Sequence, residues 1–336
     1  MKNLGMKNVV VLGSTGMLGR MALEVLEKNS ADFKIAGLSG YKNKALLNKQ
    51  NIKYKPTYGA LTDPEEIKKI VCKKDVDIVV VTCGGVDLKD AVIAAVKAGK
   101  KIAMANKEMI VEYGQEIMTA VKKSGCMFIP VDSEHSGIFQ CLRGKRMADI
   151  EKVYLTCSGG PFWNLPKKDF KKTTPEQALK HPVWKMGKKI TVDSATQMNK
   201  ALEIIEAKYL FDLRPRQIEV LIHPQSRLHA IVQFKDGNVL AHMGYPDMKI
   251  PLRYALYYPD VRGGNALKRL DLTDCRLEFF KPDLKRFPSI GFAYKALNKG
   301  VGACRKLNRI NQSAVDKFLN KEIGFLDIFA LIREKL

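Results

Sequence analysis

Two acidic residues placed two positions apart are the first candidates for chemistry in this sequence. Asp132 and Glu134 follow the apolar run 128–131. In extended backbone, residues i and i+2 point to the same side, so these carboxylates would lie together. Neighbouring like charges need a cation or a shared proton, and hard oxygen ligands favour Mg²⁺ or Mn²⁺ over zinc. An N-capping turn that carries solvated acids explains the pair nearly as well.

A third acid, Glu203, lies on a helix that the apolar spacing predicts over residues 194–211. The buried stripe of this helix would consist of Met198, Leu202, Ile205 and Tyr209. Asn199, Glu203 and Glu206 share the adjacent face, and Lys200 lies one turn before Glu203. This spacing alone favours an ordinary surface ion pair between Lys200 and Glu203.

A glycine-rich turn at residues 13–19 is the second chemical feature. The segment Gly13-Ser14-Thr15-Gly16-Met17-Leu18-Gly19 lies between a predicted strand at 9–12 and a predicted helix at 18–28. Its glycines would let the chain turn tightly and let backbone N–H groups approach a pyrophosphate. The helix dipole would favour the same anion. The alternative is a plain tight turn.

The residues after this turn differ from those of an NAD site. An NAD-binding unit has an acidic residue about 20 positions further on, which hydrogen-bonds the ribose hydroxyls. Here the segment 37–44, Gly-Leu-Ser-Gly-Tyr-Lys-Asn-Lys, offers a hydroxyl and lysines but no carboxylate. This chemistry suits a 2′-phosphate, so we predict NADP(H) rather than NAD(H).

Further candidates lie in loops. The segment His181-Pro182-Val183-Trp184-Lys185-Met186-Gly187 is either a lid that covers a substrate or a piece of core. Ser158-Gly159-Gly160-Pro161 could form a nest of N–H groups for an anion, and Ser194 is expected at a helix start, a second anion site. His223 follows a predicted strand at 220–222, where a lone histidine is more often structural.

Alternating strands and helices must position these residues. Short apolar runs and helical patterns alternate through residues 8–150, which predicts crossover units around a parallel sheet. A mixed segment with a hairpin turn at 235–238 follows, and helical patterns fill the end of the chain. We therefore predict an α/β protein. Its parts would be a Rossmann-like NADPH-binding domain at 1–150, an α/β catalytic domain at 151–281, a linker at 282–288 and a small helical domain at 289–336.

The composition fits a globular protein and argues against several other classes. The chain has 336 residues, with 57 basic and 35 acidic side chains, a net charge of +22 and 46% hydrophobic residues. No apolar run approaches the ~20 residues of a membrane span, and the N-terminus carries no secretory signal. Seven scattered cysteines without a Cys-x-x-Cys pair argue against a disulfide framework or a zinc ribbon. We expect a cytoplasmic protein, or one of the plastid stroma if a transit peptide was removed.

The excess of positive charge has two interpretations. One is a basic surface for nucleic acid or a membrane, and the other is an enzyme with anionic ligands. The lysines are spread along the chain, without an aromatic-interleaved basic patch or a helix-turn-helix signature. We therefore expect a small anionic substrate and no specific nucleic-acid or membrane partner.

Taken together, these segments resemble one family, 1-deoxy-D-xylulose-5-phosphate reductoisomerase of the non-mevalonate isoprenoid pathway. The most specific matches are His-Pro-x-Trp-x-Met-Gly at 181–187 and Val-Asp-Ser-Ala-Thr-x-Met-Asn-Lys at 192–200. Further matching stretches are 13–19, 105–108, 130–140, 158–162, 223–226 and 244–251. The resemblance implies an isomerisation and reduction of 1-deoxy-D-xylulose 5-phosphate to 2-C-methyl-D-erythritol 4-phosphate. It also implies NADPH, one Mn²⁺ or Mg²⁺ ion and a homodimer.

The resemblance also implies a role for each matching residue. The metal ligands would be Asp132, Glu134 and Glu203. The catalytic groups would be Lys107, Glu134, His181 and His223. The substrate would be bound by Ser133, Ser158, Trp184, Met186, Ser194, Asn199 and Lys200. The cofactor would be bound by Gly13, Ser14, Thr15, Gly16, Met17, Leu18, Gly40, Lys42, Asn43, Asn106, Glu108, Gly187 and Met248.

Two other functions compete with this one. A different NADP-dependent oxidoreductase, such as a semialdehyde or homoserine dehydrogenase, would share the glycine turn but would stay active in EDTA. A basic protein that binds RNA or acidic lipid would show salt-dependent binding without turnover.

Overall fold

The computed structural model describes residues 5–184, 186–263, 268–273 and 275–336, so Lys185 of the predicted lid lies outside the described residues. The chain divides into two compact units. The first contains the described residues of 1–136 and 247–268, and the second those of 137–246 and 269–336. The predicted division into three domains and a linker stays a prediction.

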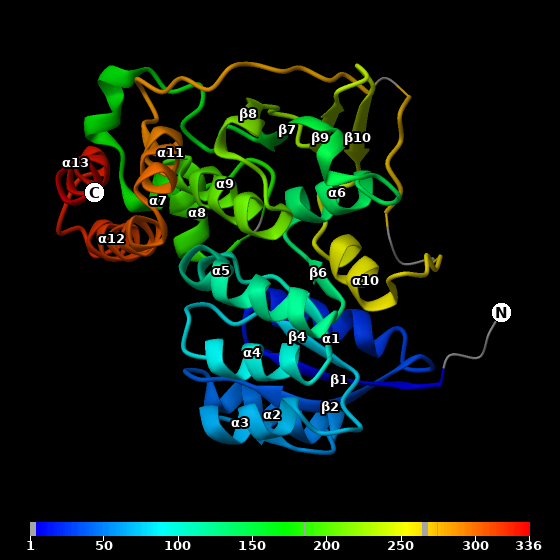
Figure 1. Ribbon diagram of the computed structural model, residues 1–336. Coiled ribbons are helices and arrows are strands. Elements are labelled where there is room, and N and C mark those ends of the chain that lie inside the picture. Colours follow the sequence, from blue (N-terminus) through cyan, green and yellow to red (C-terminus); the bar gives the residue numbers. More distant parts are fainter. Residues whose placement is uncertain (1–4, 185, 264–267, 274) are drawn as a thin grey trace. The chain divides into compact units, whose positions relative to one another are not determined.

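A parallel sheet of six strands forms the centre of the first unit (Figure 1). The strands are β1 (Lys7–Leu12), β2 (Phe33–Ser39), β3 (Ala60–Leu61), β4 (Ile78–Val81), β5 (Lys101–Met104) and β6 (Phe128–Pro130). Their order is β3-β2-β1-β4-β5-β6, which is the strand order of a dinucleotide-binding sheet. The apolar runs 9–12 and 78–81 form its buried centre, as the sequence predicts. The order reverses between β1 and β4, so ligands are expected beyond the carboxyl ends of these strands.

Helices connect and cover these strands. They are α1 (Met17–Glu27), α2 (Lys44–Tyr54), α3 (Pro64–Val71), α4 (Lys89–Lys97), α5 (Lys107–Ser124) and α10 (Lys249–Tyr257). Helix α2 is not predicted from the sequence, because its leucines and isoleucine form no single apolar stripe: Leu47 is buried and Ile52 is exposed. Helix α10 is not predicted either. This distant segment joins the first unit because the Arg253 guanidinium donates to Asn29 Oδ1 at 2.5 Å and the Tyr257 hydroxyl to Asp32 at 2.6 Å.

A mixed sheet of four strands forms the centre of the second unit. Its strands are β7 (Ile150–Cys157), β8 (Ile218–Ile222), β9 (Leu228–Phe234) and β10 (Val239–Met243), in the order β10-β9-β7-β8. Strands β7 and β8 run parallel, and the other neighbours run antiparallel. The predicted hairpin joins β9 to β10, where Gly237 takes a φ of +86° and Asn238 N–H donates to Asp236 Oδ1. Strand β10 is left at the edge of this sheet.

The helices of the second unit pack on one another and on a cluster of aromatic rings. They are α7 (Pro175–Ala178), α8 (Lys188–Ala195), α9 (Met198–Phe211), α11 (Ser289–Lys299), α12 (Val301–Leu319) and α13 (Phe325–Lys335), the last three at the orange-to-red end of Figure 1. Short 3₁₀ turns lie at Met147–Asp149, Lys167–Lys172 and Pro215–Gln217. Helix α6 (Ser133–Cys141) contains the boundary between the units, after Ser136. Phe170, Phe287 and Phe325 form the centre of the aromatic cluster.

Two sequence predictions about local structure are wrong. The helix predicted over 194–211 is two helices, because Gln197 takes a left-handed φ of +58° between α8 and α9. Ser194 therefore lies in the last turn of α8 and not at a helix start, where the dipole would attract an anion. In addition, residues 132–134 are not extended, because α6 begins at Ser133. No helix of the described residues is long and apolar enough to cross a membrane.

Candidate functional site

The glycine turn after β1 is held by hydrogen bonds to Ser39 and Gln50. Gly13 N–H donates to Ser39 Oγ at 3.1 Å, and Ser14 N–H donates to Ser39 O at 2.8 Å. The Ser14 hydroxyl donates to Gln50 Oε1 at 2.7 Å, and Gln50 Nε2 donates back to Ser14 O at 2.9 Å. Ser14 and Gln50 are both buried. The Ser14 side chain therefore fixes the turn, and only backbone atoms of this residue remain to meet a ligand.

The glycines of this turn allow backbone approaches that no side chain would permit. A Cβ added to Gly19 would lie 2.1 Å from Gly13 O, and one added to Gly13 would lie 2.4 Å from Cys83 N. Within the described residues, no side chain caps α1 at Gly16, and its first turn holds no acid. The positive end of the helix dipole is therefore left for an external anion. These features fit a dinucleotide pyrophosphate.

Four of the other predicted cofactor residues, Gly40, Lys42, Asn43 and Asn106, follow strands β2 and β5 of the same sheet. Gly40 follows β2, and a Cβ there would lie 3.0 Å from the Thr15 side chain. Asn43 caps α2 by accepting from Leu46 N–H, with exposed Lys42 just before it. Asn106 caps α5 and donates to Cys83 O and Gly85 O at 2.7 and 2.6 Å, which ties the loop after β4 to α5.

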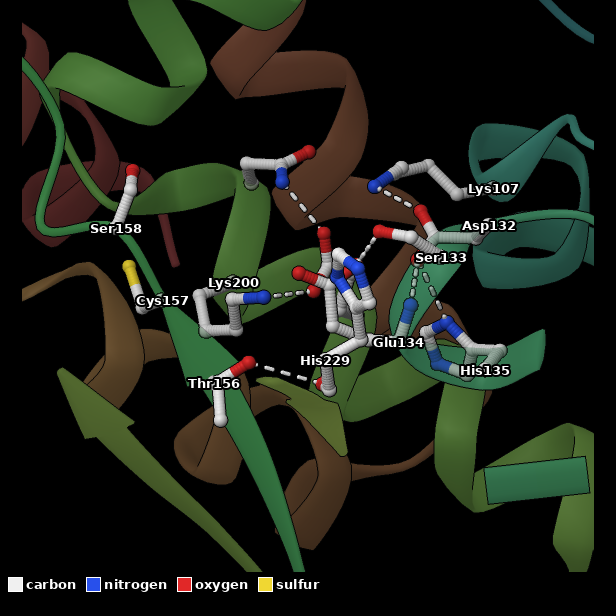
Figure 2. Close-up of polar contacts among 12 residues, drawn as sticks. Lys107, Asp132, Ser133, Glu134, His135, Thr156, Cys157, Ser158, Lys200 and His229 are labelled. Atoms are coloured by element: carbon white, nitrogen blue, oxygen red, sulfur yellow. Dashed lines mark hydrogen bonds and ion pairs between the residues drawn. The ribbon is translucent and has the colours of Figure 1, made fainter. Parts of the chain in front are cut away.

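Of the paired acids of the first unit, Asp132 is buried and Glu134 is half-buried; Figure 2 shows them with their neighbours. Asp132 Oδ1 accepts weakly from Glu134 N–H at 3.3 Å, so Asp132 does cap α6, as the alternative interpretation proposed. The Lys107 ammonium lies 2.6 Å from Asp132 Oδ2, and His135 Nδ1 lies 3.2 Å from Asp132 Oδ1. Ser133 Oγ donates to Glu134 Oε2 at 2.5 Å. The two acids offer carboxylate oxygens within 4.8 Å of one another.

The electrostatics at Asp132 keep its carboxylate ionised. Burial alone would raise the pKa of Asp132, but the Lys107 ammonium and the His135 ring outweigh this effect. They hold the pKa of Asp132 well below its ordinary value. A buried, ionised carboxylate beside a second acid is a set of hard oxygen donors, which fits a divalent ion such as Mg²⁺ or Mn²⁺.

The acid on α9 is buried as well, so the surface ion pair that the spacing favoured is wrong. Lys200 Nζ and Glu203 Oε2 form an ion pair with side-chain exposures of only 3% and 1% (Figure 2). Asn199 Nδ2 donates to Glu203 Oε1 at 2.5 Å. The predicted stripe of this helix is buried at Met198, Leu202 and Ile205. Glu203 is therefore a third hard oxygen donor, held by the two neighbouring residues that the resemblance places at the substrate phosphate.

The loop after β7 and the predicted lid are joined through a histidine of the second unit. His181 Nε2 lies 3.1 Å from Ser158 Oγ, and Gly160 N–H also donates to Ser158 Oγ, at 3.2 Å. His181 Nδ1 accepts from Val183 N–H at 3.1 Å and from Trp184 N–H at 2.8 Å. Burial lowers the pKa of His181 to about 4. The Trp184 ring lies 6.3 Å from the His229 ring and is half-buried, so it is not part of the core.

His223 is enclosed by backbone. Its Nδ1 lies 2.9 Å from Glu278 O, its Nε2 accepts from Arg227 N–H at 3.1 Å, and its ring stacks on Phe279. The residue is fully buried. Both ring nitrogens are therefore paired with backbone groups, one in the loop after β8 and one in the distant segment at Glu278, which favours the structural interpretation.

Three family models match this chain. The model for 1-deoxy-D-xylulose 5-phosphate reductoisomerase matches residues 9–71 and 59–114, and the model for its C-terminal domain matches residues 128–211. A further model, for the DXP reductoisomerase C-terminal domain, matches residues 243–336.

Relatives and solved structures agree with these models. The chain is 42% identical over 351 residues to the 1-deoxy-D-xylulose 5-phosphate reductoisomerase of Thermoanaerobacter pseudethanolicus, which covers 98% of this chain and 92% of the relative. It is 35% identical to a solved DOX-P reductoisomerase in complex with NADPH, fosmidomycin and magnesium, with a TM-score of 0.92 over 98% of this chain and 88% of that one. The enzyme from Zymomonas mobilis in complex with NADPH is 32% identical, with a TM-score of 0.90 over 98% of this chain and 91% of that one.

Proposed function

This chain belongs to the 1-deoxy-D-xylulose 5-phosphate reductoisomerase family, and from this premise we propose that it converts 1-deoxy-D-xylulose 5-phosphate to 2-C-methyl-D-erythritol 4-phosphate. It uses NADPH and a divalent metal ion. One observation carries this proposal beyond a general NADPH-dependent reduction: Asp132 and Glu203 are buried carboxylates, each paired with a buried lysine. Hydride transfer alone needs no such acids, whereas a metal-assisted rearrangement does.

We propose that the metal ligands are Asp132, Glu134 and Glu203. When bound, the divalent ion polarises the ketone of the substrate and makes its neighbouring hydroxyl more acidic. Lys107 balances the charge of Asp132, and Ser133 hydrogen-bonds Glu134, so both acids are oriented before a ligand arrives. Lys107 and Ser133 would also contact the substrate oxygens.

The substrate phosphate is assigned to Ser158, Ser194, Asn199 and Lys200. Lysine, amide and hydroxyl groups are the donors that a phosphate needs, and binding this distant group supplies energy for closing the site. Trp184 and Met186, on the loop between His181 and Gly187, would cover the substrate and exclude water.

NADPH is assigned to the glycine turn, to the segments after β2 and β5, and to Gly187 and Met248. The backbone of residues 13–18 would hold its pyrophosphate, and Gly40, Lys42 and Asn43 would lie beside the adenosine ribose. Asn106, Glu108, Gly187 and Met248 would lie toward the nicotinamide. These residues orient the cofactor, which supplies the hydride.

We assign different roles to His181 and His223. His181 borders the phosphate site through Ser158. His223 positions the loop that follows β8, because both of its ring nitrogens are occupied by backbone groups. His223 is therefore proposed as a structural residue rather than a proton carrier.

The test of the reaction is the loss of NADPH absorbance after addition of 1-deoxy-D-xylulose 5-phosphate. We expect oxidation of NADPH with Mn²⁺ or Mg²⁺, and none after EDTA removes the metal. Activity that survives EDTA would point to another NADP-dependent oxidoreductase. Folded protein that oxidises no NADPH with either metal, yet binds RNA or acidic lipid in a salt-dependent way, would point to a basic binding protein.

We further propose that the protein works as a homodimer in the cytoplasm. Edge strand β10 carries exposed Val239 and Leu240, at 55% and 40% exposure, and such an edge is normally covered or blunted by charge. Sedimentation equilibrium should give twice the chain mass of 37.7 kDa. Leu240→Lys should shift the protein toward the monomer, and a wild-type monomer at micromolar concentration would refute the proposal.

A further inference from the structure

The Ser158 hydroxyl, directly after β7, lies within hydrogen-bond distance of two nitrogen atoms; Figure 2 shows the position of Ser158. Gly160 N–H donates to Ser158 Oγ at 3.2 Å, and His181 Nε2 lies 3.1 Å away. A serine hydroxyl has two acceptor lone pairs and one proton. If the His181 nitrogen also donates, Ser158 keeps only its own proton to offer to a ligand.

The other side of the His181 ring decides which nitrogen donates. Val183 N–H and Trp184 N–H both point at Nδ1, at 3.1 and 2.8 Å. Backbone N–H groups can only donate, so Nδ1 must be the unprotonated, accepting nitrogen of a neutral imidazole. The ring proton is then on Nε2 and is donated to Ser158. Burial favours the same neutral form, because it lowers the pKa of His181 to about 4.

We propose that His181 is a positioning residue that acts through Ser158: it fixes Ser158 as a pure hydrogen-bond donor to the substrate phosphate and links it to the backbone of the lid at Val183 and Trp184. This inference rests on the phosphate site of the proposed function and deepens it. With the ring proton on Nε2, the hydroxyl proton of Ser158 has no acceptor among the described residues and can be donated to an anion. Because the same ring holds Trp184 N–H, the lid and the phosphate site share one side chain.

Two conservative variants test the roles of His181 Nδ1 and Nε2 separately. His181→Asn places an amide oxygen near the position of Nδ1, so it can still accept from the lid but no longer reaches Ser158. His181→Gln extends an amide toward the position of Nε2, so it can reach Ser158 but leaves the lid amides without an acceptor. Inorganic phosphate is the probe for Ser158, because it needs no lid and no turnover.

We expect His181→Asn to weaken phosphate binding in isothermal titration by about tenfold, as loss of one oriented hydrogen bond to an anion would. His181→Gln should weaken it by less than about threefold, and should instead lower kcat because the lid closes poorly. In a double-mutant cycle, His181→Asn should cause little further loss when Ser158 is already Ala. Combined with Ser194→Ala, a matched phosphate-site control without a hydrogen bond to His181, the losses should multiply.

A spectroscopic measurement tests the tautomer directly. Long-range ¹H–¹⁵N correlation of the imidazole rings should show His181 neutral and protonated at Nε2, with and without phosphate. The signal is identified by its absence in either variant. A charged ring with phosphate bound, or losses that multiply for His181→Asn and Ser158→Ala, would overturn the proposal and make His181 a direct phosphate ligand. These readouts do not depend on NADPH oxidation, so they fail separately from the proposed reaction.

Discussion

Replacing Glu203 with Gln should lower turnover by about a thousandfold while leaving NADPH binding nearly unchanged. The amide keeps the shape of the side chain and can still accept from Asn199, but it removes the negative charge that is proposed to hold the metal. Metal stabilisation of developing charge is worth several kcal/mol, and about 1.4 kcal/mol corresponds to a tenfold change in rate. NADPH oxidation gives the rate, and calorimetric titration with Mn²⁺ shows whether the metal is lost.

The ion pair with Lys200 makes a second variant necessary. Gln at position 203 removes the Glu203 charge from the buried Lys200 ammonium, and breaking a buried pair costs about 3–5 kcal/mol of stability. Adding Lys200→Met removes that charge, so the double variant should regain stability in thermal melting but not Mn²⁺ binding. Glu176→Gln, which breaks the exposed pair with Lys321, is the matched control and should change neither. Near-normal turnover and Mn²⁺ affinity in Glu203→Gln would remove Glu203 from the metal site.

The contrast between Glu203 and the glycine turn shows what one sequence can reveal. The strand, turn and helix around Gly13–Gly19 are adjacent in the chain, and their hydrophobic periods and glycines are local signals that predict the observed fold. The burial of Glu203 is not local. The same i,i+3 spacing with Lys200 occurs on exposed and buried helix faces, so spacing alone favours the commoner exposed pair.

Contacts between distant segments were missed for the same reason. Gln50 supports Ser14 across 36 positions from a helix without an apolar stripe. The break at Gln197 was hidden because the apolar period continues through it, and only the left-handed backbone separates α8 from α9. The tautomer of His181 depends on which groups surround the ring, so a sequence can place the histidine in the site but cannot state what it does there.

Replacing Gly19 with Ala should weaken NADPH binding by about a hundredfold and destabilise the first unit. The added methyl group would lie 2.1 Å from Gly13 O and 2.7 Å from Ser14 Cα, and both contacts are with backbone that cannot rotate away. Either α1 or the turn must move, which costs about 1–3 kcal/mol in a packed interior. Movement of the turn also displaces the N–H groups proposed to hold the pyrophosphate. The expected hundredfold loss of NADPH affinity corresponds to about 2.7 kcal/mol of binding free energy.

The comparison that isolates this effect is Gly291→Ala on α11, where an added Cβ meets nothing within 4 Å. That variant should keep its NADPH affinity and gain up to about 1 kcal/mol of stability, because Ala has a higher helix propensity than Gly. NADPH fluorescence titration and thermal melting of both variants separate a general alanine effect from a local one. Because Gln50 and Ser39 hydrogen-bond the turn, a movement of the turn that relieves the clash would strain or break those hydrogen bonds. Unchanged NADPH affinity in Gly19→Ala would therefore mean that the cofactor does not lie on this turn.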